Sequence, residues 1–396
     1  MGEAMALYVH WPFCLSKCPY CDFNSHVRRN QDVQSYAQAL LDELRHEVGR
    51  LYKPDGQRPH LRSVYFGGGT PSLMPPESVA ALIEETKALF TWAPDIEITL
   101  EANPTSSEAE RFAAFRQAGV NRLSLGVQSL DDAQLKFLGR QHNTAQARSV
   151  LERARRQFPR LSFDLIYARP GQTLGAWQRE LDEALDLCAD HLALYQLTIE
   201  PGTAFERAFG RGAFKLPTDE TATALYKATA EACARHGLHP YEVSNYARPG
   251  QESLHNLTYW RYGPYLGIGA GAHSRVRYQP KRGSQQASPL TAIMRPRVPE
   301  QWRRQVQQQG ASMAEQEQLS PQDCAREALL MGLRLREGIQ AERFKRHTGQ
   351  DLWQSVEQAF MEEAVAAGWL VAGPEGLRAT AAGRLRLDAI LPSLVA

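Results

Sequence analysis

Strand-like and helix-like stretches alternate through the first half of the chain, and this alternation restricts the fold more than any other feature. Six short runs are predicted as strands: 7–10, 63–66, 96–101, 122–128, 162–167 and 192–199. Amphipathic stretches lie between them, at 33–48, 76–90, 107–118, 144–157 and 174–187. Parallel strands need such crossover helices. We therefore predict an α/β fold whose repeated strand–helix units form a barrel or partial barrel.

Several of the predicted strands carry polar side chains on one face. In the strand at 122–128, apolar residues alternate with polar or small ones. The strand at 96–101 shows the same split, and Asp164 shares a face with Ser162. A parallel barrel without a ligand is normally filled by bulky branched residues. One polar face could belong to a solvent-facing edge strand, but agreement between strands favours a polar ligand inside the barrel.

Three cysteines, Cys14, Cys18 and Cys21, lie within eight residues near the N-terminus. Iron–sulfur clusters are held by cysteine thiolates, and a short loop can bring such ligands together. The next cysteine along the chain is Cys188, so no fourth ligand is near in sequence. Three ligands on a [4Fe-4S] cluster would leave one iron open to a small chelating molecule, much as a catalytic zinc site keeps one position open.

Two other interpretations of these cysteines are a zinc site and buried structural thiols. His10 or His26 could complete a four-ligand zinc set. The spacing Cys-x3-Cys-x2-Cys fits the usual zinc patterns poorly and favours iron and sulfur. The spacing does not distinguish an intact cluster from a degraded three-iron form.

The cysteine motif resembles the signature of the radical S-adenosylmethionine (SAM) superfamily, in which an aromatic residue, here Tyr20, precedes the last cysteine. The resemblance implies that SAM binds the open iron of a [4Fe-4S] cluster. A glycine-rich loop at 67–71 follows a predicted strand; alone it would be read as a tight turn, but here it matches the family's Gly-Gly-Thr-Pro motif. Further matches are Glu-Ala-Asn-Pro from 101, the strand at 122–128, Gly-Arg-Gln-His from 139, Asp164 and Pro-Gly-Gln-Thr from 170.

Within this superfamily the layout looks like the oxygen-independent coproporphyrinogen oxidase family. That resemblance implies a radical-SAM partial (β/α)6 barrel with a smaller C-terminal domain. It also implies a SAM site made of Tyr8, Tyr20, Gly68, Gly69, Thr70, Glu101, Gln128, Arg140 and Asp164. The sequence departs from the family at Ala168-Arg169-Pro170, where a Gly-hydrophobic-Pro loop is expected. The larger Arg169 bears on the shape of this loop but not on the neighbouring Asp164.

Three features favour the haem-chaperone members of this family over its oxidases. Phe23 stands where the oxidases have a further cysteine, and the arm before Cys14 is short. The stretch 255–260 resembles the haem motif of the chaperone members, which implies that haem contacts His255, Asn256, Tyr259 and Trp260. An exposed imidazole is a good axial ligand of haem iron. From residue types alone, however, an aromatic-rich loop with one histidine is more often a packed corner.

The resemblance therefore implies a haem chaperone that carries a [4Fe-4S] cluster and SAM and delivers haem to an acceptor protein. No coproporphyrinogen oxidase activity is expected. One alternative is an oxygen-independent coproporphyrinogen III oxidase, which would decarboxylate porphyrinogen propionates with a SAM-derived radical. Another is a radical-SAM enzyme for an unrelated small substrate. The acceptor, its association with a membrane, the mode of haem attachment and any catalytic residues stay open.

The chain exceeds what one hydrophobic core usually holds, so we expect more than one domain. The predicted divisions are a radical SAM barrel with the haem motif at its end (1–274), a basic Gln/Pro-rich connector (275–319) and a winged-helix-like domain (320–396). The connector carries many arginines and is predicted to be solvated, with contact to haem propionates or an anionic membrane as a second interpretation. In the last division, helices at 322–335, 340–347 and 352–367 precede a hairpin at 369–380.

Composition restricts the location and the partners. The net charge of +1 argues against a general nucleic-acid binder. The N-terminus shows no basic region followed by an apolar run, so no signal peptide is expected. No apolar stretch approaches the ~20 residues that span a bilayer. The cysteines outside the motif are scattered and do not suggest a disulfide framework, which favours a cytoplasmic location.

Overall fold

The computed structural model describes residues 4–28, 32–51, 56–279 and 289–395, and its main feature is a twelve-stranded sheet. The predicted strands are all present, and each is parallel to the next. They are β1 (Met5–Trp11), β4 (His60–Gly68), β5 (Thr91–Ala102), β6 (Arg122–Gln128), β7 (Arg160–Tyr167) and β8 (His191–Gln196). The alternation of strands and helices therefore predicts the parallel part of the fold correctly.

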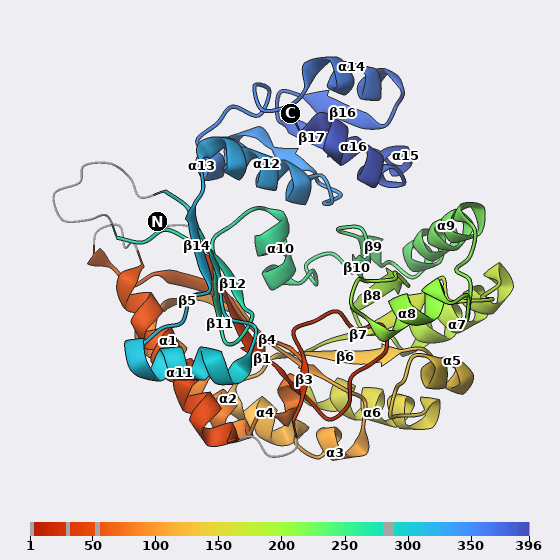
Figure 1. Ribbon diagram of the computed structural model, residues 1–396. Helices are drawn as coiled ribbons and strands as arrows, with labels where there is room; N and C mark the ends of the chain where they lie inside the picture. Colours follow the sequence, from red (N-terminus) through yellow and green to blue (C-terminus); the bar gives the residue numbers. More distant parts are fainter. Residues whose placement is uncertain (1–3, 29–31, 52–55, 280–288, 396) are drawn as a thin grey trace.

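Helices cover the outer face of this curved sheet (Figure 1). The predicted helical stretches are found as α1 (Val33–Arg50), α2 (Pro76–Leu89), α3 (Ser106–Ala109) with α4 (Phe112–Ala118), α6 (Thr144–Gln157) and α7 (Leu174–Leu187). Further helices are α5 (Asp132–Phe137), α8 (Ala204–Gly210) and α9 (Asp219–Arg235). In β6 the apolar residues Leu123, Leu125 and Val127 are fully buried in the main core. The residues that alternate with them consequently point to the concave face.

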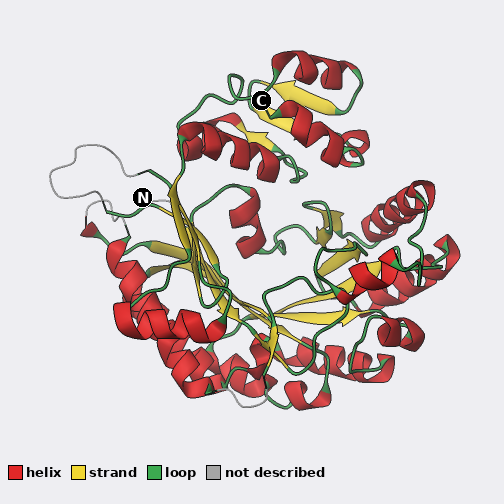
Figure 2. Cartoon of the chain, in the orientation of Figure 1, coloured by secondary structure: helices red, strands yellow, loops and turns green. Residues whose placement is uncertain are grey.

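The sheet continues on both sides of the six predicted strands. Beside β1 lie β11 (Tyr265–Ile268), which is parallel to it, and the antiparallel strands β12 (His273–Val276), β13 (Thr291–Met294) and β14 (Glu315–Gln318). Beside β8 lie β10 (Asn245–Ala247) and β9 (His239–Pro240). In the part of the chain that the structure describes, the edge strands β14 and β9 do not pair with each other. The barrel is therefore partial and open on one side (Figure 2).

The stretch 275–319 is not the solvated connector that its composition suggests. It supplies β13, α11 (Pro299–Gln309) and β14 to the barrel domain. Arg295 is 1% exposed, and its guanidinium lies 3.5 Å from Glu43 and 3.2 Å from Glu47 of α1. A run of basic residues does not reveal such burial, because the carboxylates that neutralise the arginine lie far earlier in the chain. Lys281 and Arg282 of this stretch lie outside the described residues.

The C-terminal domain has a hydrophobic core of its own, which includes Leu329, Leu333 and Leu391. Its helices α12 (Pro321–Gly332), α13 (Ala341–Thr348) and α14 (Gln358–Ala366) precede the hairpin of β16 (Leu370–Gly373) and β17 (Gly376–Ala379). β15 (Ile339–Gln340) completes the small sheet, and α15 (Ala381–Arg384) and α16 (Leu387–Leu394) end the chain. The predicted order of helices and hairpin is confirmed, except that the helix expected from residue 352 begins at Gln358.

The short helix α10 (Leu254–Trp260) lies between the barrel and the C-terminal domain (Figure 1). Arg261, directly after α10, makes two hydrogen bonds of 2.8 Å to Glu337. Arg275 of β12 donates to Glu327 of α12 at 2.9 and 2.7 Å. Because paired hydrogen bonds between guanidinium and carboxylate define orientation, these contacts hold the C-terminal domain over the concave face of the sheet.

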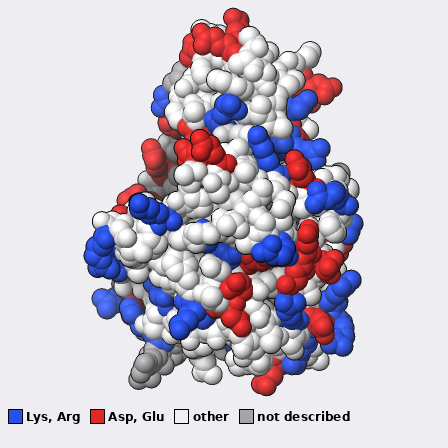
Figure 3. Space-filling model, turned by 90° about the vertical axis from the view of Figure 1, so that its right-hand side faces the viewer, with Lys and Arg blue, Asp and Glu red and all other residues white. Residues whose placement is uncertain are grey.

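The surface carries a mixture of charges. On the face shown in Figure 3, Lys and Arg side chains are interspersed with Asp and Glu side chains. This arrangement matches the net charge of +1 and lacks, on that face, the broad basic footprint of a general nucleic-acid binder. In the described ranges, none of the helices has the length and apolar character that crossing a bilayer requires.

Candidate cofactor and ligand cavity

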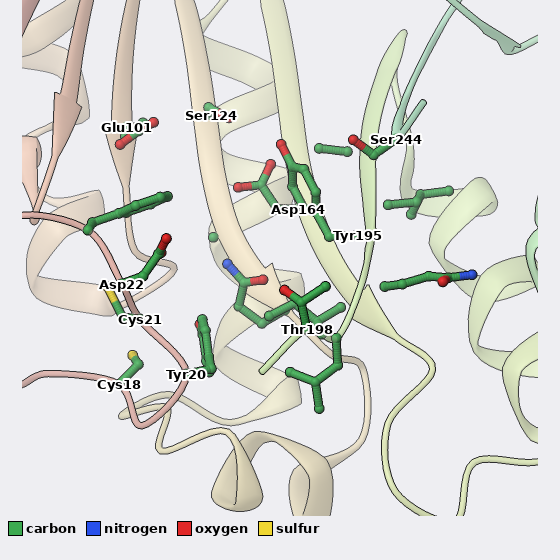
Figure 4. A pocket seen from close by; sticks show the side chains of 18 of the residues that line it. Cys18, Tyr20, Cys21, Asp22, Glu101, Ser124, Asp164, Tyr195, Thr198 and Ser244 are labelled. Carbon is green, nitrogen blue, oxygen red and sulfur yellow. The ribbon is translucent and has the colours of Figure 1, made fainter. Parts of the chain in front are cut away.

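A cavity of about 1110 Å³ opens on the concave face of the sheet, beneath the C-terminal domain. Ligand pockets usually enclose about 300–1,000 Å³, so this cavity has room for more than one small molecule. The cysteine loop lines one end, strands β5 to β8 line the wall, and the C-terminal domain lines the other end. Figure 4 shows Cys18 and Cys21 on one side, Ser244 on the other, and Asp164 between them.

The cysteine loop is anchored through the residues between its thiols. Pro19 packs against Gly139, where an added Cβ would lie 2.6 Å from Pro19 Cδ. The Pro19 carbonyl accepts a hydrogen bond of 2.9 Å from the Phe205 N–H, and the Tyr20 ring lies 6.3 Å from the Phe205 ring. These contacts leave the three thiols, which are all free, to line the cavity.

The surroundings of the thiols fit an iron–sulfur cluster. Each sulfur has a hydrogen-bonding neighbour: Thr70 for Cys14 (3.4 Å), Arg140 for Cys18 (3.4 Å) and Ser25 for Cys21 (3.8 Å). Burial raises the pKa of Cys14 and Cys21, so cluster assembly must release their protons. Hydrogen bonds to the sulfur atoms tune the potential of such clusters. Bound here, a [4Fe-4S] cluster would supply electrons and one open iron.

The two histidines that could complete a zinc set differ in their hydrogen bonds: His10 is held through both ring nitrogens and His26 through Nε2. His10 Nδ1 lies 3.0 Å from the Tyr8 hydroxyl, and His10 Nε2 lies 2.9 Å from the Asn24 carbonyl. His26 Nε2 lies 3.1 Å from the Arg297 carbonyl. The hydrogen bonds of His10 therefore argue against this histidine as a zinc ligand.

The glycine-rich loop after β4 passes directly behind the cysteine loop. Gly68 has a φ of +119°, and its N–H donates to Glu101 at 3.2 Å. A Cβ at Gly69 would lie 2.9 Å from both Cys14 Sγ and the Phe13 carbonyl oxygen. Glycine is thus required here for a left-handed conformation at one position and for close approach of two loops at the next.

We expect Gly69→Ala to lower the amount of iron that the reconstituted protein retains. The new methyl group must push the cysteine loop aside, at a cost of about 1–3 kcal/mol. Iron and sulfide per chain after gel filtration would measure the effect. Gly49→Ala is the control, because an added Cβ at Gly49 meets nothing within 4 Å. Equal iron content in Gly69→Ala and wild type would contradict the prediction.

Two carboxylates from neighbouring parts of the wall, Glu101 of β5 and Asp164 of β7, line the cavity (Figure 4). Glu101 accepts a hydrogen bond of 2.7 Å from the Tyr65 hydroxyl. Burial raises the pKa of Glu101 and, with a smaller contribution from the Glu101 charge, raises the pKa of Asp164 to about 7. Two carboxylates that are only partly compensated suit a ligand with positive charge or several hydroxyl groups.

We expect Asp164→Asn to make the free energy of unfolding less dependent on pH. The pKa of Asp164 is raised from 3.8 to about 7, so the folded state binds the proton more tightly than the unfolded state does. The contribution of Asp164 to the free energy of unfolding is therefore most favourable below pH ~4 and is lost as the pH rises toward ~7. When the pH is raised from about 5 to about 8, the free energy of unfolding of the variant, relative to that of wild type, should rise by at least about 1 kcal/mol. Urea unfolding at both pH values measures this, and an unchanged difference would refute it.

Arg140 connects three segments at the cysteine end of the cavity. Besides its contact with Cys18, it donates to Asn103 at 2.6 Å and to the Gly126 carbonyl at 2.7 Å. Gln128, at the end of β6, has a φ of +71° and also lines the cavity. The structure thus brings most of the expected SAM residues into one cavity: Tyr20, Gly68, Gly69, Thr70, Glu101, Gln128, Arg140 and Asp164. Tyr8 is not among the lining residues and stacks behind Tyr65 at 6.2 Å.

The loop that departs from the family pattern is held by a buried ion pair. Arg169 is 2% exposed and contacts both the Glu180 carboxylate and the Ser129 hydroxyl. Ala168 before it has a φ of +56°. Because Ser129 follows β6 and Arg169 follows β7, the contact ties two strand ends together. The arginine is accommodated without displacing Asp164 from the cavity wall.

Of the four residues expected to contact haem, Asn256 lines the cavity and the others do not. His255 is 2% exposed, and its ring stacks on Tyr65 at 4.7 Å. Tyr259 meets the His255 ring edge-on at 4.7 Å. Trp260 lies against the C-terminal domain, with Arg334 5.9 Å from its ring centroid. The motif is therefore split between the cavity, the barrel interior and the domain junction.

In the part of the chain that the structure describes, His255 has one ring nitrogen held by a hydrogen bond and the other free, as metal-binding histidines do, but its side chain is buried. Its Nδ1 lies 3.0 Å from the Ser63 hydroxyl, whereas its Nε2 has no hydrogen-bond partner within the described residues. Burial lowers the pKa of His255 to about 3, so the imidazole is neutral. A neutral imidazole with one nitrogen held and the other free is the form that binds metals. Coordination at Nε2 requires α10 to move, because the side chain is buried.

Several cavity residues were not singled out by the sequence. They are Arg122, His191, Tyr195, Arg334 and Arg384. His191 lies in a chain of hydrogen bonds: 2.7 Å to Ser162, 3.0 Å to Tyr241, and onward 3.3 Å to Asn256. Arg122 and Tyr195 lie on predicted strands and could have been found from their inward positions. Nothing in the sequence marks the two C-terminal arginines, because only domain docking brings them to the cavity.

Comparisons with known proteins agree with this architecture. The model of the radical SAM superfamily matches residues 8–184, and that of the HemN C-terminal domain matches residues 319–386. The chain is 36% identical to heme chaperone HemW of Haemophilus influenzae, over 98% of this chain and 97% of the relative. The chain belongs to the HemW family. Its identity to HemW of Escherichia coli is 34%, over 99% of this chain and 98% of the relative.

Other relatives of this HemW-family chain carry a different name. It is 39% identical to the mitochondrial radical S-adenosyl methionine domain-containing protein 1 of Bos taurus, over 100% of this chain and 88% of the relative. Among solved structures, coproporphyrinogen III oxidase (HemN) of Escherichia coli matches with a TM-score of 0.79 and 23% identity. That match covers 98% of this chain and 89% of the oxidase and shows the fold alone. Membership of the radical SAM superfamily implies a [4Fe-4S] cluster and SAM.

Proposed function

We propose that this protein is a haem chaperone, which binds haem and delivers it to an acceptor protein. In this proposal Cys14, Cys18 and Cys21 hold a [4Fe-4S] cluster, and SAM occupies the adjoining end of the cavity. The observation that carries the proposal is the full-length similarity to proteins named heme chaperone HemW. The wide cavity beneath the C-terminal domain supports it, because space remains beyond the expected SAM residues.

His255 is the proposed haem contact. Its free Nε2, neutral imidazole and hydrogen bond to Ser63 support this role. The ring becomes available when α10 moves away from β4. Such a movement is compatible with the position of α10 at the domain junction, where Arg261 and Glu337 form an ion pair that is partly exposed.

Coproporphyrinogen oxidation is the rival function. The fold of the oxidase matches, but a match at 23% identity carries no activity with it. Phe23, which replaces the cysteine expected in the oxidases, is 59% exposed beside the cysteine loop. The phenylalanine at this position therefore favours the chaperone function over the oxidase function.

We place the protein in a reducing compartment, the cytoplasm, because Cys188, Cys233 and Cys324 are buried free thiols. The acceptor is proposed to be a protein, whether free or associated with a membrane. No role in nucleic-acid binding is proposed.

Haem titration of the reconstituted protein tests the function. We expect stoichiometric binding by wild type and binding weaker by about 10-fold or more in His255→Ala, since even the loss of a group that hydrogen-bonds a metal ligand costs about 10–100-fold. His236→Ala is the control, because that histidine is exposed at the end of α9. Absence of haem binding, together with SAM cleavage and protoporphyrinogen formation from coproporphyrinogen, would replace the proposal with the oxidase function.

A further inference from the structure

The end of the cavity under the C-terminal domain differs chemically from the cysteine end. The C-terminal domain lines it with Arg334, Arg384, Leu385, Leu387 and Asp388. This wall thus carries two guanidinium groups, one carboxylate and two leucine side chains. The wall combines apolar surface with an excess of positive charge.

Arg334 and Arg384 have no acidic partner among the described residues. Arg334 lies over the Trp260 ring at 5.9 Å. Arg384 donates to the Ala379 carbonyl at 3.4 Å, and its charge partly offsets the rise that burial causes in the pKa of Tyr226 of α9. All of these partners are uncharged, so the positive charges of both arginines remain available to an anion.

Other arginines at the same domain junction are neutralised. Arg261 pairs with Glu337 at 2.8 Å, and Arg275 pairs with Glu327 at 2.7 Å. These pairs already hold the two domains together. The two cavity arginines are consequently not required as the ionic contacts of the junction, and their lack of a carboxylate distinguishes them from their neighbours.

The barrel side of the cavity adds complementary groups. Tyr195 of β8 is 41% exposed and lines the cavity, as does Val243. Arg122 lines the cavity wall and is 3% exposed, and its Nε is 3.9 Å from Glu97, beyond hydrogen-bond distance. Asn256 brings the haem motif to the same space. An aromatic ring and aliphatic groups thus line the same cavity as the arginines.

We propose that this end of the cavity is a carboxylate-binding compartment, in which Arg334 and Arg384 receive the propionate groups of haem. Haem is a flat apolar macrocycle with two carboxylates on one edge. Leu385, Leu387 and Tyr195 suit its faces, and the arginines suit that edge, since guanidinium binds carboxylate through paired hydrogen bonds. The inference rests on the proposed haem-binding function and adds that the C-terminal domain clamps haem against the barrel.

Comparing haem with haem dimethyl ester, whose propionates are blocked, tests the compartment. Both ligands are titrated into reconstituted wild type and into the double variant Arg334→Gln/Arg384→Gln, with absorbance as the readout. The matched control is Arg336→Gln/Arg386→Gln. These two arginines lie two residues further along, are exposed and stand outside the cavity. The control therefore removes the same net charge without touching the compartment.

We expect haem binding to weaken by roughly 10-fold or more for each cavity arginine, as for other hydrogen bonds to charged groups. The control variant should bind haem like wild type. The dimethyl ester should bind wild type more weakly than haem does and should not distinguish wild type from the cavity variant. A purely structural role of the arginines would instead weaken both ligands equally, and thermal unfolding of each variant would reveal it.

The possible failures are distinguishable. If the cavity variant binds haem as tightly as wild type, or loses both ligands equally, the carboxylate compartment is wrong and the haem-binding function stands. If wild type binds neither ligand, the proposed function and the compartment are both overturned. If the double variant weakens the binding of haem alone, the single variants Arg334→Gln and Arg384→Gln assign that loss to one side chain or to both.

Discussion

Replacing Glu97 with alanine is expected to lower the free energy of unfolding by about 3–5 kcal/mol, the usual cost of removing one partner of a buried ion pair. Glu97 of β5 is 0% exposed and accepts a hydrogen bond of 2.8 Å from Arg160 of β7. It also accepts from the N-terminus of α10, at 3.2 Å from the Ser253 hydroxyl and 3.1 Å from the His255 N–H. The substitution would remove the carboxylate partner of the partly buried Arg160 and the acceptor of two backbone N–H groups at the start of α10.

Chemical denaturation of the full chain would measure this loss in the free energy of unfolding. Glu84→Ala is the matched control, because Glu84 is 65% exposed and its ion pair with Lys87 is at the surface. Such pairs contribute about 0–1 kcal/mol. A loss below ~1 kcal/mol in Glu97→Ala would show that the carboxylate does not organise this region. Because Glu97 also holds the first turn of α10, the variant should in addition alter haem binding through His255.

Cys18→Ser is expected to reduce the iron and sulfide of the reconstituted protein to background. Cys18 is one of only three thiols on the loop, and a hydroxyl is a poor substitute for thiolate at iron. The residue is partly exposed at the cavity edge, so the change should leave the fold intact. Cluster absorbance and chemical analysis of iron provide the measurement, and circular dichroism monitors the fold.

The control for Cys18→Ser is Cys324→Ala, which removes a buried thiol of α12 far from the cysteine loop. This variant should assemble its cluster like wild type. Retention of a full cluster by Cys18→Ser would mean that the ligand set differs from the predicted one and that another side chain binds the iron.

The parallel sheet and the cysteine end of the cavity follow from local patterns. Strand and helix periodicity located β1, β4, β5, β6, β7 and β8 and the helices between them. Parallel strands place their carboxyl ends at one edge of a sheet, so Glu101, Gln128 and other residues near these ends were predictable neighbours. The cysteines are near in sequence and need only a short loop to face the same space.

Contacts between residues far apart in the chain were harder to predict from the sequence. The basic stretch 275–319 reads as a solvated connector, yet Arg295 is buried against Glu43 and Glu47 of α1. Composition counts charges but does not show which are neutralised. The haem motif likewise did not show whether His255 is exposed or packed, and in the structure its ring contacts those of Tyr65 and Tyr259.

The sequence by itself determined the parallel α/β fold, the cysteine loop and the glycine-rich loop behind it, because each depends on residues near one another in the chain. The tertiary structure alone decided what the far end of the cavity contains. Arg334 and Arg384 reach it only because the ion pairs of Arg261 and Arg275 dock the C-terminal domain over the open sheet. Docking depends on contacts between distant segments, and local periodicity carries no information about such contacts.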